Sequence, residues 1–452
     1  MKQIAVAKIG GSILRNPQGM VDALKVLEEY TQIKIVIVSA TYNTTNELEE
    51  IARAAISEND QILEDHLSNL LKKHLVYIQD LGLPPSIETI VNSLLTDTRK
   101  LTQKIKKDGF ISPKNMDSLY SIGELLSSQL MACFFQKSLP SKRVRFFDAR
   151  LLIKTDSNFN NAVPQKNEIK SAVDLNLASS LIDDSLLVIP GFIGANEKGE
   201  TTTLGREGSD FSAALLAEAI SATELQIWKD VPGIFTGDPK LIKNARPVAE
   251  ISFEEVNKFS EKGAKILFPS ALIPVMESNI PVYIGWIHDH KKGTKIYKKK
   301  DKAPKLIGIT HQGELIRYEL EKKSQDNSLT NFMENIKTIL NTHRVGYRAI
   351  FYDGERVNFH ILIKDRFPES ALTQLEEFSI VSKFPNISLI SIVGEQMEYF
   401  SKKILKVLSE LEKNGISLIP VEQSIDSWTF SFPSRVDEKV LNSVHDELFL
   451  NR

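Results

Sequence analysis

The start of the chain reads as a strand, a glycine turn, a helix and a second strand, and this order constrains the fold more than any other feature. Residues 3–8 are mostly apolar and run into the turn Gly10–Ser12. An amphipathic helical pattern at 17–31 follows, and then the apolar run 33–40. Buried parallel strands have such unbroken apolar runs, and the loops at their carboxyl ends bind ligands. The opening therefore predicts an α/β fold with a mainly parallel sheet.

A second informative stretch lies at 201–265, where glycines and opposite charges stand at the ends of predicted strands and helices. The run 205–210 places Arg206 and Asp210 at the start of a predicted helix, whose N-terminus favours an anion. With Lys8 beside its own glycine turn, this composition indicates a site that holds phosphates. A structural Gly-Gly turn and a surface Arg–Asp pair with a capping serine explain the same residues more simply. Both interpretations stay open on the residues alone.

Composition excludes several classes of protein. With 452 residues the chain is expected to form two or three domains. Its net charge of -2 gives no general attraction to nucleic acid or to an anionic membrane, so we expect neither partner. No apolar run is long enough to cross a bilayer, and the first residues lack the pattern of a signal peptide. The single cysteine, Cys133, lies in an apolar run and fits a core thiol in a reducing compartment. We therefore expect a cytoplasmic protein.

Familiar catalytic motifs are missing from the sequence. It has no phosphate-binding P-loop, no dinucleotide-binding glycine pattern and no protein-kinase signature. The eight histidines are scattered, and the close pair His288 and His290 has no cysteine partner, so no protein metal site is expected.

The domain organisation follows from changes in pattern along the chain. A helical lobe is predicted at about 47–138 within a first domain at 1–290, and the basic stretch 291–305 is expected to be a solvated linker. From 306 onward, short strands alternate with single helices in two βαββαβ-type runs, which predicts two ferredoxin-like modules at 306–385 and 386–452. The terminal segment is a candidate to complete the first module.

A series of motifs then identifies a family. The chain contains K-I-G-G-S at 8–12, V-S-A-x-x-x-T-T-N at 38–46, S-I-G-E-L-L-S at 121–127, G-F-I-G at 191–194, T-T-L-G-R-E-G-S-D-F-S-A-A at 202–214, D-V-P-G-I-F-T-G-D-P at 230–239, G-A-K-I-L-F-P at 263–269 and N-I-P-V at 279–282. In order and spacing these motifs resemble the aspartate kinases of the amino-acid kinase family over about residues 1–290. The resemblance implies a three-layer α/β fold and the ATP-dependent phosphorylation of the L-aspartate side-chain carboxylate to 4-phospho-L-aspartate. That reaction is the first step toward lysine, threonine and methionine.

The resemblance also implies roles for individual residues. Lys8 and Asp210 are the expected catalytic pair, in which Lys8 neutralises the moving phosphoryl group and Asp210 orients the lysine. The expected aspartate-binding residues are Thr45, Glu124, Arg206 and Ser209. The expected ATP-binding residues are Lys8, Gly10, Gly11, Ser12, Lys229, Asp230, Phe235, Asp238 and Lys265. Mg²⁺ is expected to bridge the phosphates with few direct protein ligands.

Several positions depart from the family's usual pattern. A carboxylate, Glu207, stands where the family usually has glycine, and Lys229 replaces the usual threonine. Phe235 replaces tyrosine, while Pro190 and Phe268 replace glutamine and histidine. All proposed catalytic residues are nevertheless present, so we expect activity with altered nucleotide affinity.

The C-terminal modules resemble the paired ACT domains of aspartate kinases, and most of all those of the lysine-sensitive type. This resemblance implies a homodimer that binds an amino-acid effector, lysine being the first candidate. The segments 317–328 and 350–358 depart from the small, hydroxyl-rich loops expected around an effector. A kinase for another acid such as glutamate, and a non-catalytic amino-acid sensor, are the two alternative functions.

Overall fold

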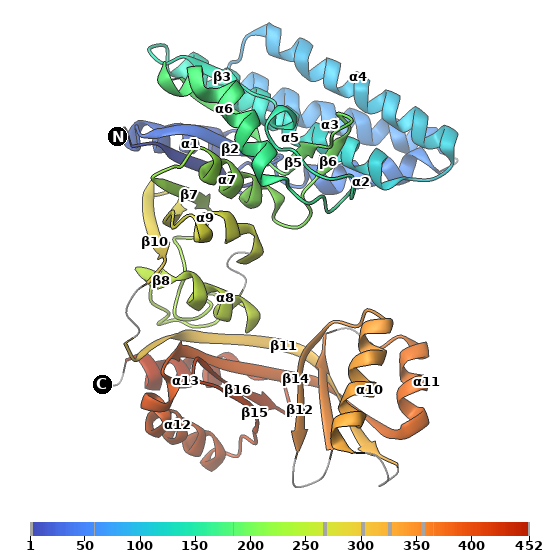
Figure 1. The fold of residues 1–452 in the computed structure, drawn as a ribbon, viewed down its shortest axis with the longest axis vertical. Coiled ribbons are helices and arrows are strands. Elements are labelled where there is room, and N and C mark those ends of the chain that lie inside the picture. The colour runs from blue at the N-terminus through green and yellow to red at the C-terminus, as the bar shows by residue number, and fades with distance from the viewer. Residues whose placement is uncertain are drawn as a thin grey trace. The chain divides into compact units, whose positions relative to one another are not determined.

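The computed structural model describes residues 3–57, 59–183, 185–264, 269–299, 303–323, 328–353, 358–364 and 366–450. They fall into two compact units (Figure 1). The first unit comprises residues 1–234, 249–253 and 267–299, and the second comprises 235–248, 254–266 and 300–452. The predicted boundary at 290 therefore differs from this division, because two segments before it belong to the second unit.

An eight-stranded sheet forms the centre of the first unit, in the order β3-β4-β2-β1-β7-β9-β10-β8. All neighbouring pairs are parallel except β9 and β10. The central strands β1 and β2 are buried along their whole length, as the unbroken apolar runs predict. The strands are β1 (Ala5–Ile9), β2 (Ile33–Val38), β3 (Val144–Phe146), β4 (Leu186–Pro190), β7 (Glu224–Lys229), β8 (Glu250–Ser252), β9 (Val282–Trp286) and β10 (Lys291–Tyr297). A small hairpin of β5 (Ile193–Ala195) and β6 (Thr201–Thr203) lies outside this sheet.

Helices cover the sheet and form the predicted lobe. The lobe comprises α2 (Thr44–Ala55), α3 (Asp60–Asp80), α4 (Pro85–Asp108) and α5 (Pro113–Ser138), and further helices are α1 (Gln18–Glu29), α6 (Lys166–Ile182), α7 (Gly208–Ala219) and α9 (Ile273–Glu277). The ends of the lobe helices are set by the sequence: Ser112 Oγ accepts from Asn115 N at the start of α5, and Gly109 ends α4 at φ 73°. One apolar core joins the lobe helices to the sheet. Cys133 packs against this core but is only partly buried, so the prediction of a core thiol is met only in part.

The expected linker at 291–305 is wrong for its first half. Residues 291–297 form β10, which pairs with β9 and β8. The lysines that suggested a solvated stretch alternate with Thr294 and Ile296, which are buried. Lys292 Nζ also lies 2.6 Å from Glu224 Oε1, so a charge that looked free in the sequence is paired. The segment is a strand despite its basic composition because its buried and exposed side chains alternate and because it pairs with strands that are distant in the sequence.

The second unit is built on a six-stranded antiparallel sheet in the order β12-β13-β11-β14-β16-β15. Its strands are β11 (Lys305–Lys322), β12 (Tyr347–Asp353), β13 (Asn358–Ile363), β14 (Ser379–Glu395), β15 (Ile419–Gln423) and β16 (Ser427–Phe432). Its helices are α10 (Leu329–Thr342), α11 (Glu369–Phe378), α12 (Ser401–Lys413) and α13 (Glu438–Phe449). Two separate helix-covered cores confirm two modules of βαββαβ type (Figure 1).

The two modules share their long strands, which corrects the expectation that the terminal segment completes the first module. Tyr318 and Leu320, in the second half of β11, pack in the core of the first module with α10 and α11. Ile309, in the first half of β11, packs instead with α12 and α13 in the core of the second module. The first strand of this unit, β11, therefore contributes to both modules, because its 18 residues are enough to cross both.

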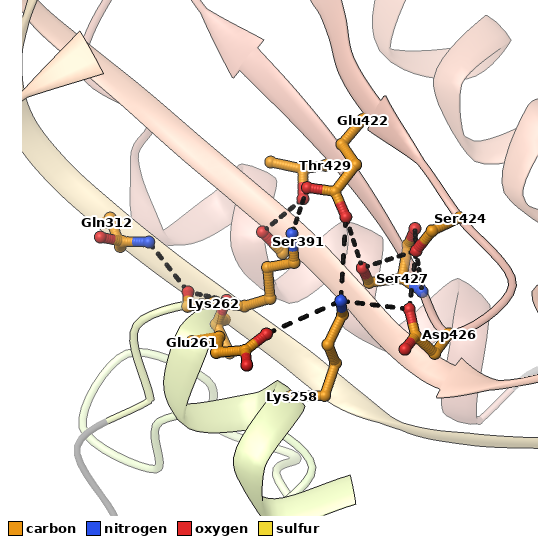
Figure 2. A network of polar contacts seen from close by, with 11 residues as sticks. Lys258, Glu261, Lys262, Gln312, Ser391, Glu422, Ser424, Asp426, Ser427 and Thr429 are labelled. Atoms are coloured by element: carbon orange, nitrogen blue, oxygen red, sulfur yellow. Dashed lines mark hydrogen bonds and ion pairs between the residues drawn. The ribbon is translucent and has the colours of Figure 1, made fainter. Parts of the chain in front are cut away.

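Two segments from the predicted catalytic domain pack within the second unit. Residue Thr236 donates or accepts a hydrogen bond with His445 Nε2 at 2.8 Å, and its carbonyl accepts from Ile309 N. The helix α8 (Phe253–Glu261) and the turn after it bring Lys258 and Lys262 to Glu422 and Asp426. Figure 2 shows these four residues, which we call the α8 ion-pair cluster.

Candidate active site

A cavity of about 380 Å³ opens in the first unit at the carboxyl ends of β1 and β2 and at the start of α7. Parallel sheets place their ligand sites at this edge, as the opening of the sequence predicted. The lining residues are Lys8, Gly11, Ser12, Ser39, Ala40, Thr41, Tyr42, Asn43, Thr45, Glu124, Phe192, Gly205, Glu207, Gly208, Ser209 and Asp210. The cavity thus brings together seven of the predicted site residues from four separate parts of the sequence.

Lys8 and Asp210 form an ion pair in this cavity. Lys8 is the fourth residue of β1, and Asp210 lies in the first turn of α7, which packs against β1, β2 and β7. The Lys8 Nζ lies 2.7 Å from Asp210 Oδ1, with side-chain exposures of 9% and 1%. Burial alone would raise the pKa of Asp210, but the ammonium groups of Lys8 and Lys229 outweigh burial and hold that pKa below its ordinary value. The aspartate is therefore ionised at neutral pH, as an orienting partner for Lys8 must be.

The glycine turn after β1 lets the backbone come close to neighbouring chain. A Cβ on Gly11 would lie 2.8 Å from the Ala40 carbonyl oxygen, so only glycine fits without a shift. Ile13 N donates to Gly10 O, which closes the turn, and Gly11 and Ser12 line the cavity. Gly10 is buried beneath them next to Lys8 and does not line the cavity. The turn can offer amides and a hydroxyl to an anion that approaches Lys8.

Glu124 lines the cavity from α5. Its Oε1 accepts from Ala40 N at 3.4 Å, while its buried Oε2 has no hydrogen-bond partner in the described structure. Burial raises the pKa of Glu124 to about 8. Helix α5 lies close to the loop after β2, since Ser127 Oγ donates to Ser39 O at 2.7 Å. A carboxyl group with one unsatisfied oxygen at a cavity wall is suited to receive a cationic group from a ligand.

The loop between β2 and α2 adds hydroxyl groups to the cavity. Thr45 lines it from the first turn of α2. The helix begins at Thr44 after Asn43, which has φ 65° and gives no side-chain cap. A hydrogen bond between two buried hydroxyl groups stabilises the loop instead, since Thr41 Oγ1 lies 2.6 Å from Thr44 Oγ1.

The remaining predicted residues lie elsewhere. Arg206 is exposed and does not line the cavity, although its neighbours on both sides do. Lys229 ends β7 and is partly buried, and Asp230, which follows it, is exposed. Phe235 and Asp238 belong to the second unit, and Lys265 and Phe268 lie outside the described residues. The nucleotide-binding half of the prediction therefore stays a prediction.

Asp117 is a structural residue that sequence reasoning missed, although it does not itself line the cavity. Its carboxylate accepts from Asn160 N at 3.0 Å, from Thr203 N at 2.9 Å and from Thr203 Oγ1 at 2.7 Å. It ties α5 to β6 and to the loop before α6, close to the start of the T-T-L-G-R motif. Asp117 and Glu124 are seven residues apart, which is two helical turns. A second acidic residue on the same face of an otherwise apolar helix was the signal available in the sequence.

No group of three His, Cys, Asp or Glu side chains in the described ranges is arranged to hold a metal ion. Likewise, none of the helices within those ranges combines the length and the apolar character needed to span a bilayer.

The chain is similar in sequence to a known family and to several of its members. The model of the amino acid kinase family matches residues 3–285. Lysine-sensitive aspartokinase 3 of Escherichia coli is 28% identical over 99% of this chain and 100% of its own length. The aspartokinase of Chlamydia pneumoniae is also 28% identical, over 98% of this chain and 97% of its own length.

Solved structures show the same likeness. The crystal structure of E. coli aspartokinase III in complex with aspartate and ADP has a TM-score of 0.80 at 26% identity, and covers 99% of this chain and 100% of that one. The complex of the same enzyme with lysine and aspartate has a TM-score of 0.83 at 27% identity, and covers 99% of both chains. These matches confirm the predicted fold class, an α/β kinase fold followed by two ACT modules.

Proposed function

The chain belongs to the amino acid kinase family, and we propose that it is an aspartate kinase, which transfers the γ-phosphoryl group of ATP to the side-chain carboxylate of L-aspartate. The observation that carries the proposal is the pairing, in one cavity, of a buried lysine–aspartate pair with a buried carboxyl group. Lys8 offers a positive charge to an anion, and Glu124 offers a buried carboxyl group that ionises when it pairs with an ammonium. An amino acid that must be brought to a phosphate needs both.

The chemistry requires positioning more than proton transfer. The aspartate side chain, with a pKa near 4, is already ionised at neutral pH and needs no general base. One carboxylate oxygen forms a bond to the γ-phosphorus while the bond from that phosphorus to the β–γ bridging oxygen breaks, and ADP leaves with the electron pair. Charge repulsion between two anions is the main barrier. The Lys8 ammonium offsets it by neutralising the phosphoryl oxygens, and Asp210 fixes the lysine in place.

The substrate side of the cavity is assigned by charge. Glu124 receives the α-ammonium of aspartate, and Thr45 and Ser209 donate hydroxyl hydrogen bonds to its oxygens. Arg206 clamps a carboxylate through its guanidinium, which requires its exposed side chain to turn toward the cavity when aspartate binds.

The nucleotide side of the proposal rests on the glycine turn and on the family resemblance. Gly10, Gly11 and Ser12 contribute amides and a hydroxyl to the phosphates, and Asp230, Phe235, Asp238 and Lys265 are the proposed partners of the remainder of ATP. Lys229, which the resemblance implied as an ATP-binding residue, does not line the cavity. Mg²⁺ is proposed as an ion bound mainly to the phosphates, with few direct protein ligands. When bound, it would neutralise the charge of the phosphates.

Regulation is part of the proposal. The relative named lysine-sensitive, and its structure in complex with lysine, support lysine as an effector of the ACT modules. Residues 324–327 and 354–357, within the two segments that depart from the usual effector loops, lie outside the described residues. A homodimer is proposed from the ACT resemblance, and a reducing, cytoplasmic location from the single Cys133.

The test is a coupled assay of ADP release from Mg-ATP with aspartate, with glutamate and with no acceptor. We expect turnover that depends on aspartate and that lysine inhibits. Glutamate-dependent turnover alone would favour a kinase for another acid. Binding of lysine or aspartate without any turnover would favour a non-catalytic sensor.

A further inference from the structure

The ion pair of Lys8 and Asp210 in the cavity limits how much positive charge Lys8 can offer to a phosphoryl group. Lys8 and Asp210 form an ion pair at 2.7 Å, and both are almost wholly buried. Such a pair is neutral as a whole, so Asp210 cancels much of the charge that Lys8 would offer to a phosphoryl group. A lysine that stabilises a transferring anion needs a partner that holds it in place without removing its effect.

A third charge lies next to this pair through the register of the sheet. Strand β1 pairs with β7 in parallel, with Lys8 opposite Ile227. Because side chains alternate along a strand, Lys229 lies on the same face of the sheet as Ile227 and Lys8, one step nearer the carboxyl end. Trp228 points to the opposite face, where it is fully buried in the apolar core and contacts Tyr30. Helix α7, which carries Asp210, packs against β7 as well as β1.

From this placement we propose that Lys229 is a positioning residue for phosphoryl transfer, acting through Asp210. The carboxylate of Asp210 lies in the field of two ammonium groups, Lys8 and Lys229. Lys229 therefore offsets part of the charge of Asp210, and Lys8 keeps more of its positive effect toward the cavity than it would in an isolated ion pair. The carboxylates of Glu207 and Asp230 also act on Lys229, but both side chains are exposed to water. Lys229 itself does not line the cavity, which favours an indirect role over direct contact with substrate. The inference rests on the proposed kinase function and deepens the account of its site.

The titration of these groups agrees with that arrangement. Burial lowers the pKa of Lys229, and the charge of Lys8 lowers it further, while Asp210, Glu207 and Asp230 act in the opposite direction. Lys229 also contributes to the lowered pKa of Asp210. Lys229 therefore loses its charge at a lower pH than an exposed lysine does. Turnover should fall as pH rises through that value.

The experiment compares Lys229→Met, which removes the charge and keeps the bulk, with Lys229→Arg, which keeps the charge at all accessible pH. For Lys229→Met we expect kcat to fall by roughly tenfold or more, with the KM of ATP and of aspartate nearly unchanged. Lys229→Arg should retain most of kcat and move the alkaline limb of the pH–kcat profile upward. Lys170→Met, on an exposed part of α6, is the matched control and should leave kcat unchanged.

Three results would overturn the inference. The first is a rise in the KM of ATP at unchanged kcat, which would mean direct contact of Lys229 with the nucleotide. The second is an alkaline limb that Lys229→Arg does not move. The third would come from a measurement that is independent of activity, nitrogen NMR of the full chain without substrates. In that measurement we expect the Lys229 ammonium to lose its proton at a lower pH than an exposed lysine, and at a still lower pH in Asp210→Asn. A titration like that of Lys170 would contradict the arrangement, whereas a wild-type chain without aspartate-dependent turnover would sink the proposed function alone.

Discussion

Two sets of lysine–carboxylate pairs in this molecule show how differently the same chemistry can be used. In the first unit, Lys8 and Asp210 meet at 2.7 Å with side-chain exposures of 9% and 1%. In the α8 ion-pair cluster of the second unit, Lys258 lies 3.3 Å from Asp426 and 4.0 Å from Glu422, whose side chains are 44% and 40% exposed. Figure 2 shows this second set as a spread network with serine and threonine hydroxyls around it.

The difference is one of desolvation. A buried pair such as Lys8–Asp210 has lost its hydration, so removing one partner leaves an uncompensated charge and is strongly unfavourable. The exposed carboxylates of the α8 ion-pair cluster keep much of their water, and salt screens them. We therefore expect the buried pair to take part in catalysis. We expect the exposed network to make only a weak contribution to the attachment of α8 to the sheet of the second unit. Backbone contacts support the second role, since Lys262 O accepts from Thr310 Oγ1 and from Gln312 Nε2.

The largest expected effect is on the buried pair. We expect Lys8→Ala to reduce kcat by about 10³-fold or more, because the transferring phosphoryl group loses its nearest charge. Lys258→Ala, from the α8 ion-pair cluster, is the matched control and should leave kcat unchanged. Circular dichroism of both variants checks that each is folded. If a folded Lys8→Ala variant keeps turnover, the buried Lys8–Asp210 pair does not have the proposed catalytic role.

A buried carboxylate without a lysine partner sharpens the comparison. Asp117 accepts three hydrogen bonds from Asn160 and Thr203, and burial raises its pKa. Asp117→Ala leaves these donors unsatisfied, and we expect a loss of about 3 kcal/mol in stability. Thermal unfolding followed by tryptophan fluorescence should show a lower midpoint. Asp97→Ala, whose carboxylate is exposed and pairs with Lys100, is the control, and equal effects would contradict the account.

The third prediction concerns pH and Glu124. Its pKa of about 8 means that the empty site holds a protonated carboxyl at neutral pH. An incoming α-ammonium requires the ionised form, so aspartate binding releases a proton. The apparent affinity for aspartate should then rise by roughly tenfold per pH unit below pH 8 and level off above it. Calorimetry in buffers of different ionisation enthalpy measures the proton release directly.

The same shift affects the stability of the ligand-free protein. The folded state binds a proton that the unfolded state has lost between the ordinary pKa of a glutamate and about 8, so the contribution of Glu124 is lost as pH rises through that window. Glu124→Gln should remove this pH dependence and weaken aspartate binding. An affinity for aspartate that does not change between pH 6 and 8 would show that Glu124 is not its ammonium partner.

The smallest effect belongs to the α8 ion-pair cluster. Glu422→Lys places like charges together and should destabilise the second unit by about 1 kcal/mol or less, an effect that fades in high salt. Adding Lys262→Glu reverses both charges and should recover part of the loss. A cost of several kcal/mol that persists in molar salt would mean that this network is desolvated like Lys8–Asp210, and the comparison would fail.

The sequence predicted several residues that line the cavity, and it did so for a physical reason. Lys8, the Gly10–Ser12 turn and Asp210 stand at the ends of a strongly apolar strand and at the start of a helix, and local patterns fix both. What local patterns do not fix is pairing between distant segments. The lysines of β10 dominate its composition and predict a linker, whereas pairing with β8 and β9 makes the segment a strand.

The same limit applies to the second unit and to Asp117. The 18-residue strand β11 crosses two modules because β13 and β14 lie on either side of it, which no local pattern reveals. The α8 ion-pair cluster joins residues more than 150 positions apart. Asp117 stands out in the sequence only as a second acidic residue on a largely apolar helix, and that pattern does not reveal its partner Thr203 from a separate hairpin.

The most direct test of the account is to identify the product of the reaction. An acyl phosphate reacts with hydroxylamine to give a hydroxamate, so the wild-type chain with Mg-ATP, L-aspartate and hydroxylamine should form the hydroxamate of the aspartate side chain in step with ADP. The reaction should not occur with Lys8→Ala. ADP release without any hydroxamate, or a hydroxamate formed from glutamate and not from aspartate, would contradict phosphorylation of the aspartate carboxylate in this cavity.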